Sequence, residues 1–162
     1  TRALSETALV QIAASLLPFF RGDDTKAEPM LQASFVTGVA FSHARLGVIH
    51  GLAHPLGARF HAAHGLCCAC CLPACLAFNR AAIQPDLDLL KARHGLDVLA
   101  TVDGWLREMS LSSPFIGGKV PDRDAFVRET LASGSTAANP RTVTADDVLA
   151  LLDQILAGGN SL

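Results

Sequence analysis

Apolar side chains recur at helical spacing along much of this chain. In residues 3–20 and again in residues 28–46 they follow one another at intervals of three or four: Leu4, Ala8, Ile12, Leu16 and Phe19, then Leu31, Phe35 and Val39. Such intervals place side chains on one face of an α-helix. No stretch alternates apolar and polar residues as a half-buried strand does. The pattern therefore predicts an all-α domain, a multi-helix bundle of roughly seven to nine helices.

Prolines, glycines and capping residues predict where these helices begin, bend and end. We expect helices over residues 3–20, 28–46, 48–60, 65–78, 87–94, 98–109, 122–131 and 144–156. A break or kink is expected at Pro55, and an interruption or bend at Pro73, because proline removes a backbone hydrogen bond and crowds the preceding turn. Asp122 and Thr144 are expected to cap the last two helices. Residues 112–121 read as a loop rich in proline and glycine.

The composition is apolar for a free-standing domain of this length. Half of the 162 residues are hydrophobic and 17% are charged. The chain is long enough for one domain with a real core, but so few charges favour a surface covered by a partner domain or a homo-oligomer. The net charge of −2 gives no basic surface for nucleic acid. No apolar run approaches the roughly 20 residues of a membrane span, so neither nucleic acid nor a membrane is an expected partner.

Five cysteines lie close together, at positions 67, 68, 70, 71 and 75. Such a cluster would be a liability in an oxidising compartment, which indicates a reducing cytoplasm. Two C-x-x-C spacings would suit a metal or Fe–S site, although a second pair from another segment is missing. A redox disulfide is a second interpretation, but the motif does not follow a strand. We favour a third, in which free thiols pack as small hydrophobic side chains.

Three histidines, His50, His54 and His64, lie among small and apolar residues. Burying an imidazole without a partner is unfavourable, so a shared ion such as Fe, Zn, Co or Ni is a good reason for three of them. His50 and His54 are four residues apart and share one face of a helix. A bend near Pro55 and Gly57 would let His64 return toward them. Spacing alone favours His50 and His54 as the ligand pair.

The residues around these histidines form a dense motif. They read Ala-Phe-Ser at 40–42, Leu-Gly at 46–47, His-Gly-Leu-Ala-His-Pro-Leu-Gly at 50–57 and His-Gly at 64–65, with Asn-Pro-Arg later at 139–141. This arrangement resembles the iron-containing (group III) alcohol dehydrogenases. The resemblance implies that residues 1–162 form the helical C-terminal domain of the dehydroquinate synthase-like fold of that family. It also implies that His50 and His64 are metal ligands, whereas His54 lines the pocket beside the metal as a catalytic residue.

What the resemblance implies about activity is a metal-dependent, NAD(P)-linked alcohol dehydrogenase acting on a small alcohol or carbonyl substrate. Fe²⁺ or Zn²⁺ would act as a Lewis acid, the nicotinamide would carry the hydride, and His54 would relay the alcohol proton. The family's N-terminal nucleotide-binding domain and its Asp-x-x-x-His pair of further ligands have no counterpart in this sequence. We therefore expect the C-terminal half of a longer enzyme, which alone is inactive and binds metal weakly or not at all.

Two alternatives to an alcohol dehydrogenase stay open. One is a non-catalytic helical fragment or interaction module. The other is a maleylacetate reductase-like member of the same family, although those proteins carry a His-His-Lys-x-x-His segment, and residues 50–54 read His-Gly-Leu-Ala-His. The remaining histidines, His43, His61 and His94, are expected to be structural or solvated.

Overall fold

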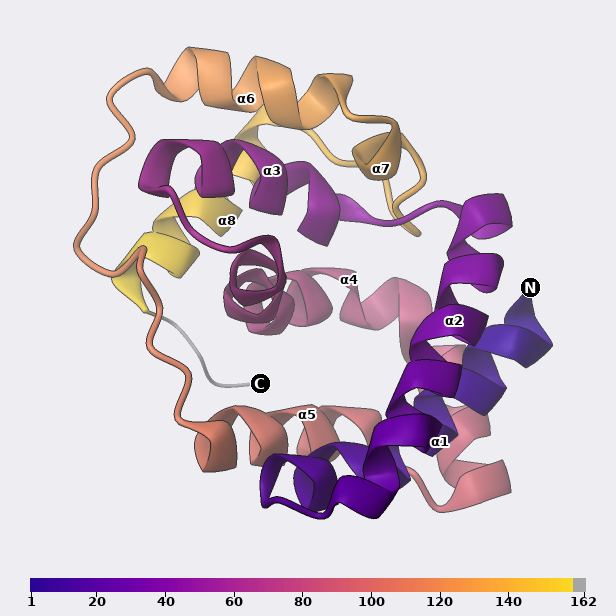
Figure 1. The fold of residues 1–162 in the computed structure, drawn as a ribbon. Helices are drawn as coiled ribbons and strands as arrows, with labels where there is room; N and C mark the ends of the chain where they lie inside the picture. The colour runs from indigo at the N-terminus through magenta and orange to yellow at the C-terminus, as the bar shows by residue number, and fades with distance from the viewer. Residues whose placement is uncertain (159–162) are drawn as a thin grey trace. The chain divides into compact units, whose positions relative to one another are not determined.

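The computed structural model describes residues 1–158, which contain eight α-helices, one 3₁₀ turn and no strand (Figure 1). The predicted all-α class is confirmed for this part of the chain. In order, the elements are α1 (Arg2–Phe20), η1 (Asp24–Lys26), α2 (Ala27–Ala44), α3 (Val48–Phe60), α4 (His64–His94), α5 (Val98–Met109), α6 (Arg123–Ala132), α7 (Gly134–Ala137) and α8 (Ala145–Ala157).

The helices gather into two compact units. Unit 1 consists of Thr1–Arg45 and Pro85–Met109, and unit 2 consists of Leu46–Gln84 and the chain from Ser110 onwards. The helices α1, α2 and α5 therefore belong to unit 1, while α3, α6, α7 and α8 belong to unit 2. The long helix α4 contributes residues to both.

Unit 1 is built on small buried residues. Its helix α1 packs along α2, and the buried side chains of the unit are short: Ala8, Ser15, Ala33, Ala40 and Val102. Small side chains allow two helix backbones to approach closely, but they bury little apolar area. The Arg21 guanidinium donates to both carboxylate oxygens of Glu108, at 2.6 and 2.7 Å, and so joins the end of α1 to α5.

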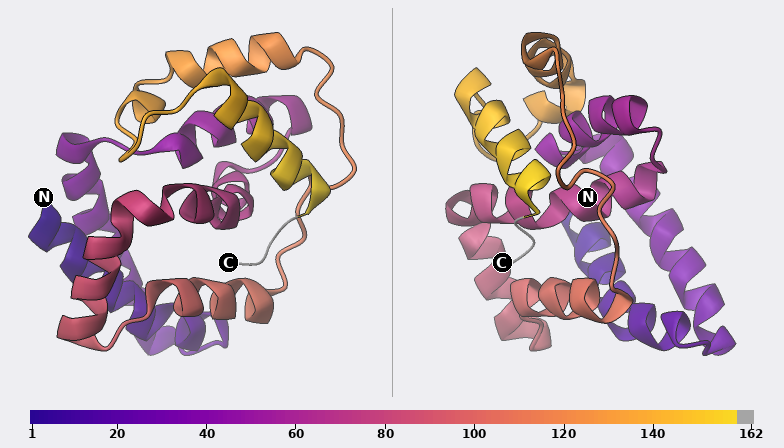
Figure 2. Two further views of the ribbon diagram at one scale, coloured as in Figure 1. Left: turned by 180° about the vertical axis from the view of Figure 1, so that it is seen from behind. Right: turned by 90° about the vertical axis from the view of Figure 1, so that its left-hand side faces the viewer.

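Unit 2 contains a continuous core of large apolar side chains. Helix α6 lies beside both α3 and α8 (Figure 2). The residues buried between these helices, α4 and the loop before α6 include Val48, Leu52, Leu56, Phe115, Phe126, Val148, Leu152 and Ile155. Burying one such side chain stabilises the fold by about 1.5–3 kcal/mol. This core positions both helices that carry the motif histidines.

Four of the five cysteines take part in the core of unit 2: Cys67, Cys70, Cys71 and Cys75. Burial raises the pKa of each of these thiols, that of Cys75 to about 12. They are therefore protonated and unreactive at neutral pH. The packing interpretation is confirmed for these four, whereas Cys68 is only half-buried.

Two expected interruptions of helices are absent. Of the break or kink expected at Pro55, the break is wrong, because α3 continues from Val48 to Phe60 with Pro55 buried inside it. The separate helices expected at 65–78 and 87–94 are one 31-residue helix, α4, which includes Pro73 and Pro85. The interruption offered for Pro73 is therefore wrong, and the bend offered there stays a prediction. Pro55 and Pro73 are both buried, and burial of the surrounding apolar side chains outweighs the hydrogen bond that each of these two prolines removes.

The capping predictions are confirmed, and one short helix was not anticipated. Asp122 accepts from the Ala125 backbone N–H at 2.8 Å. Thr144 and Asp147 form a reciprocal capping box at the start of α8. The four-residue helix α7 lies in a segment without apolar periodicity, so the spacing of apolar residues does not predict it.

By length and composition alone, α1 and α4 are long and apolar enough to cross a membrane. The sequence prediction counted apolar runs, whereas an average over 18 residues tolerates a few charges. In α4, 39% of the apolar window is buried inside the protein, and the core helix of a soluble protein satisfies the same criterion. One or two such helices are weak evidence for a membrane span.

Candidate metal site

Helix α3 carries His50 and His54, and an asparagine from the distant C-terminal motif fixes its first turn. The Val48 N–H donates to Asn139 Oδ1 at 3.1 Å. Asn139 also pairs with Asn79 of α4 through two amide hydrogen bonds of 3.0 and 2.8 Å, and it donates to the Arg141 carbonyl oxygen at 2.9 Å. Because buried amides need their partners, this network holds the start of α3 against α4.

Glycine between the two histidines lets α3 pack closely on its neighbours. A Cβ at Gly51 would lie 1.9 Å from Thr136 Oγ1 and 3.5 Å from the Thr130 carbonyl oxygen. No ordinary side chain fits in that space, so the Gly that follows His50 is required by packing against α6 and α7. This close packing fixes the position of α3 and therefore the positions of the His50 and His54 imidazoles that it carries.

A tight turn after α3 returns the chain toward His50. His61 adopts the left-handed conformation with φ of 50° at the end of α3, and the Ala62 N–H donates to the Gly57 carbonyl oxygen at 3.2 Å. Helix α4 begins directly afterwards, at His64. The predicted return of His64 is confirmed, although the turn lies after Phe60 and not at Pro55.

The three motif histidines lie together. Their ring centroids are separated by 5.1 Å for His54 and His64, by 5.2 Å for His50 and His64, and by 6.1 Å for His50 and His54. The pair favoured by spacing alone is the most widely separated. The group of potential ligand atoms within 4.8 Å of one another contains His50 and His64 but not His54. This geometry agrees with the ligand pair implied by the family resemblance, which stays a prediction.

The electrostatic environment suits a metal ligand at His50. Burial lowers the pKa of this imidazole, and the neighbouring His64 and His54 lower it further. His50 is therefore neutral at neutral pH, with a free nitrogen lone pair, which is the form that coordinates a metal. The donor set fits a divalent ion of the first transition row.

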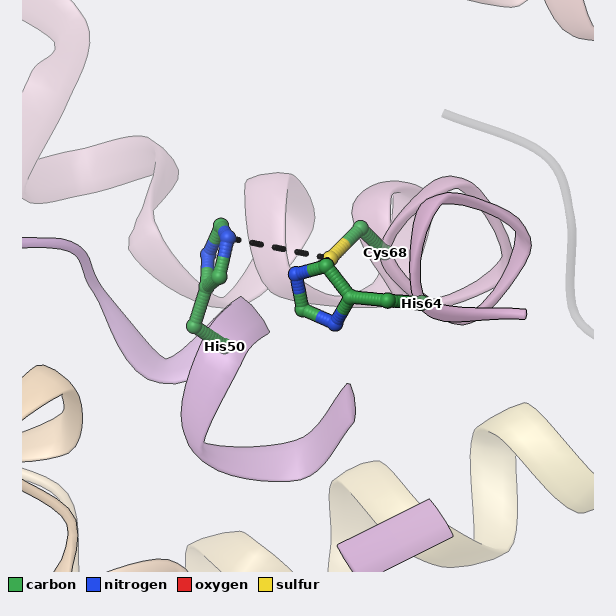
Figure 3. A group of neighbouring side chains, drawn as sticks. All are labelled: His50, His64 and Cys68. Carbon is green, nitrogen blue, oxygen red and sulfur yellow. Dashed lines mark hydrogen bonds between the residues drawn. The ribbon is translucent and has the colours of Figure 1, made fainter. Parts of the chain in front are cut away.

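Sequence reasoning missed one member of this cluster, Cys68. Its Sγ lies 3.5 Å from His64 Nε2 and 3.8 Å from His50 Nε2. Figure 3 shows the three side chains together, with His50 on α3 and the other two on α4. The spacing of four residues between His64 and Cys68 on one helix was the available signal. Within residues 1–158, the C-x-x-C partners Cys70 and Cys71 belong to no potential metal group.

The other histidines lie apart from this cluster, as predicted. His43 and His61 are exposed. His94 contacts Glu6 in unit 1, with 2.7 Å between His94 Nε2 and the carboxylate. None of the three therefore contributes to the candidate site.

Comparison with known proteins identifies the family. Residues 1–156 match the model of the C-terminal part of the Fe-containing alcohol dehydrogenase family. The chain is 28% identical to the lactaldehyde reductase of Escherichia coli K12, over 93% of this chain and 43% of that protein. It is 27% identical to the NADPH-dependent butanol dehydrogenase of Clostridium saccharobutylicum, over 98% of this chain and 45% of that protein.

A solved structure agrees with these sequence matches. The alcohol dehydrogenase from Oenococcus oeni superimposes with a TM-score of 0.81 at 25% identity, over 95% of this chain and 44% of the other. The chain thus spans less than half the length of the relatives it matches. Its helical fold, its clustered histidines and a family match over nearly its whole length lead to one assignment. This chain belongs to the Fe-containing alcohol dehydrogenase family and corresponds to the C-terminal region of its members.

Proposed function

We propose that this chain is the metal-binding C-terminal half of a metal-dependent, NAD(P)-linked alcohol dehydrogenase that interconverts an alcohol and an aldehyde or ketone. The observation that carries the proposal is the convergence of His50, His54 and His64 at one point between α3 and α4. Relatives named for lactaldehyde, for butanol and for NADPH dependence support a short alcohol or carbonyl substrate and a nicotinamide cofactor.

Each histidine has a separate role in this proposal. His50 and His64 hold the ion through ring nitrogens, and the neutral state of His50 prepares it for that role. Bound there, Fe²⁺ or Zn²⁺ supplies Lewis acidity toward the substrate oxygen. His54 is exposed beside the pair, and an imidazole can hold or release a proton near neutral pH. We therefore assign proton transfer with the substrate hydroxyl to His54.

The proposal places the nucleotide-binding part outside this chain. The relatives are more than twice as long as the segment that this chain matches in them. Two histidines also leave a divalent ion short of the usual four ligands. We propose that a nucleotide-binding domain supplies the cofactor site, and that an Asp-x-x-x-His helix outside this chain supplies further ligands.

We also propose that the protein forms a homo-oligomer in a reducing cytoplasm and binds neither nucleic acid nor a membrane. Five free cysteines support the reducing compartment. Leu31 and Phe35 on α2 are 72% and 73% exposed, and exposed apolar faces favour association. Light scattering of the purified protein should give a mass of at least twice the protomer, and Phe35→Glu should lower that mass if this face is used.

Activity of the protein expressed with the coding region upstream of Thr1 tests the proposed function. With NAD⁺ or NADP⁺, added Fe²⁺ or Zn²⁺ and a panel of short alcohols, we expect turnover that chelator removes and metal restores. His54→Ala should keep the metal and lower kcat. The 162-residue chain alone should be inactive. Turnover by the isolated chain, or an upstream region without a nucleotide-binding domain, would contradict the proposal.

A further inference from the structure

Cys68 packs against the core of unit 2 but, unlike the other four cysteines, is not buried in it. Its neighbour Cys67 is fully buried against α3, whereas Cys68 is half-buried and turns toward the imidazoles. Consecutive helical residues point about 100° apart, so one side of α4 can supply the core while the adjacent side faces His50. Cys68 and His64 share that adjacent side because they are four residues apart.

The two sulfur–nitrogen distances in this cluster match those of a tetrahedral metal centre. With Zn–S of about 2.3 Å and Zn–N of about 2.0–2.1 Å, tetrahedral angles separate sulfur and nitrogen ligands by about 3.6 Å. The observed separations from Cys68 Sγ are 3.5 Å to His64 Nε2 and 3.8 Å to His50 Nε2. All three ligand atoms lie within 4.8 Å of one another. Rotation of the side chains is needed to bring all three atoms to one ion.

Hydrogen bonds join these three side chains in one arrangement of protons only. A neutral Cys68 can donate its S–H proton to one ring nitrogen, and it accepts from the other imidazole only if that ring carries its proton on Nε2. Two imidazole nitrogens from different helices nevertheless converge on the same sulfur. A cation between the three atoms would satisfy all of them at once.

We infer that Cys68 is a third metal ligand from this chain, which with His50 and His64 forms a His₂Cys site for a borderline divalent ion such as Zn²⁺ or Co²⁺. The inference rests on the proposed function for its two histidine ligands and adds a ligand of different chemistry. On binding, the Cys68 thiol releases its proton to solvent and the thiolate coordinates the ion. The fourth position is left for a further ligand from outside this chain, or for water or substrate.

The third ligand changes what the isolated chain can do. Two histidines alone make a poor site, from which the sequence predicts weak metal binding or none. Three converging ligands raise the affinity, and a thiolate shifts preference toward Zn²⁺ and away from ions that prefer oxygen ligands. The 162-residue chain should therefore bind Zn²⁺ or Co²⁺ without any residue from outside it.

Titration of the reduced chain with Co²⁺ alone tests this inference. Thiolate coordination should give a near-ultraviolet sulfur-to-cobalt charge-transfer band that saturates at one ion per chain. Cys68→Asn should abolish the band. It should also weaken Zn²⁺ binding, measured by competition with Co²⁺, by more than about tenfold, because losing a ligand should cost at least as much as losing a residue that only supports one. Cys70→Ala is the matched control, because Cys70 is also on α4 but lies in the core; it should keep the band. Circular dichroism confirms that both variants remain helical.

Each other outcome overturns the inference in a distinguishable way. A band that persists in Cys68→Asn would assign the thiolate to another cysteine. Cobalt bound with ligand-field absorption but no sulfur band would leave a histidine-only site, which removes Cys68 and keeps the proposed function. A folded chain that binds neither ion would show that these three side chains do not suffice. The metal content of the protein with its upstream region would then decide the proposed function separately.

Discussion

The two units of this chain bury apolar residues in different ways, and the candidate site belongs to only one of them. Unit 2 encloses large side chains such as Leu52 and Phe126, both fully buried. Unit 1 encloses mainly alanines and leaves Leu31 and Phe35 exposed. A ligand set must be held to a fraction of an ångström by packed supports. The comparison teaches that the core of unit 2 fixes the geometry of the histidines, whereas unit 1 leaves large apolar side chains on its surface.

The same leucine truncation in each unit gives the largest expected contrast. Leu52→Ala removes a fully buried side chain between His50 and His54 and should lower the free energy of unfolding by about 2–5 kcal/mol. Leu31→Ala, at a position 72% exposed, should change it by less than about 0.5 kcal/mol. Urea denaturation followed by circular dichroism measures both. Equal losses would show that α2 is packed in solution and would end the distinction between the units.

Alanine substitutions at Gly51 in unit 2 and at Gly38 in unit 1 should change the stability of the fold in opposite directions. A Cβ at Gly51 would overlap Thr136 Oγ1, so Gly51→Ala should destabilise the fold by about 1–3 kcal/mol, as overpacking does. A Cβ at Gly38 in α2 would meet no atom within 4 Å. Gly38→Ala should therefore stabilise by about 0.5–1 kcal/mol through helix propensity. Thermal melts of the two variants test this, and destabilisation by Gly38→Ala would point to an unseen neighbour on that face.

Acid sensitivity should differ least between the units, because each holds a partly exposed carboxylate paired with a basic side chain. Hydrogen bonds from Arg59 lower the pKa of Glu129 in unit 2 below its ordinary 4.5. A lowered folded pKa means that the pair stabilises the protein above pH 4.5 and that this contribution is lost as pH falls through the lower folded value. In unit 1 the contact with His94 similarly lowers the pKa of Glu6.

Substituting one carboxylate at a time measures these contributions. Glu129→Gln should reduce stability at pH 7 by about 0.2–1 kcal/mol, the range of surface pairs, and should flatten the acid limb of the stability profile. Glu6→Gln should flatten the same limb. Denaturation from pH 7 down to pH 3 checks both variants. Stability of Glu129→Gln that falls as steeply with acid as that of the unmodified protein would contradict the assigned role of Arg59.

Spacing and capping residues were enough to predict most of the helices in both units. The caps at Asp122 and Thr144 were predicted because they depend only on residues three positions away. The continuation of α3 through Pro55 and of α4 through Pro73 could not be predicted locally. It depends on burial against helices that are distant in sequence, and that stabilisation exceeds the local effect of proline.

The candidate site shows the same division between local and distant information. The histidine motif indicated three clustered residues, but spacing favoured His50 and His54, and only the return of the chain after His61 brings His64 beside His50. Cys68 was grouped with its neighbours as a packing residue. Cys68 is one residue further along α4 than Cys67, which lies in the core. Only the position of α3 shows that this one-residue difference turns Cys68 toward His50.

The account depends most on His50 and His64 holding the ion while His54 does not. Metal bound per chain, measured after equilibrium dialysis against Zn²⁺ at a concentration that saturates the unmodified protein, tests this directly with three alanine variants. His50→Ala and His64→Ala should lose most of the metal, and His54→Ala, on the same face of α3, should retain nearly all of it. Full occupancy in His50→Ala, or loss of metal in His54→Ala, would contradict the assignment.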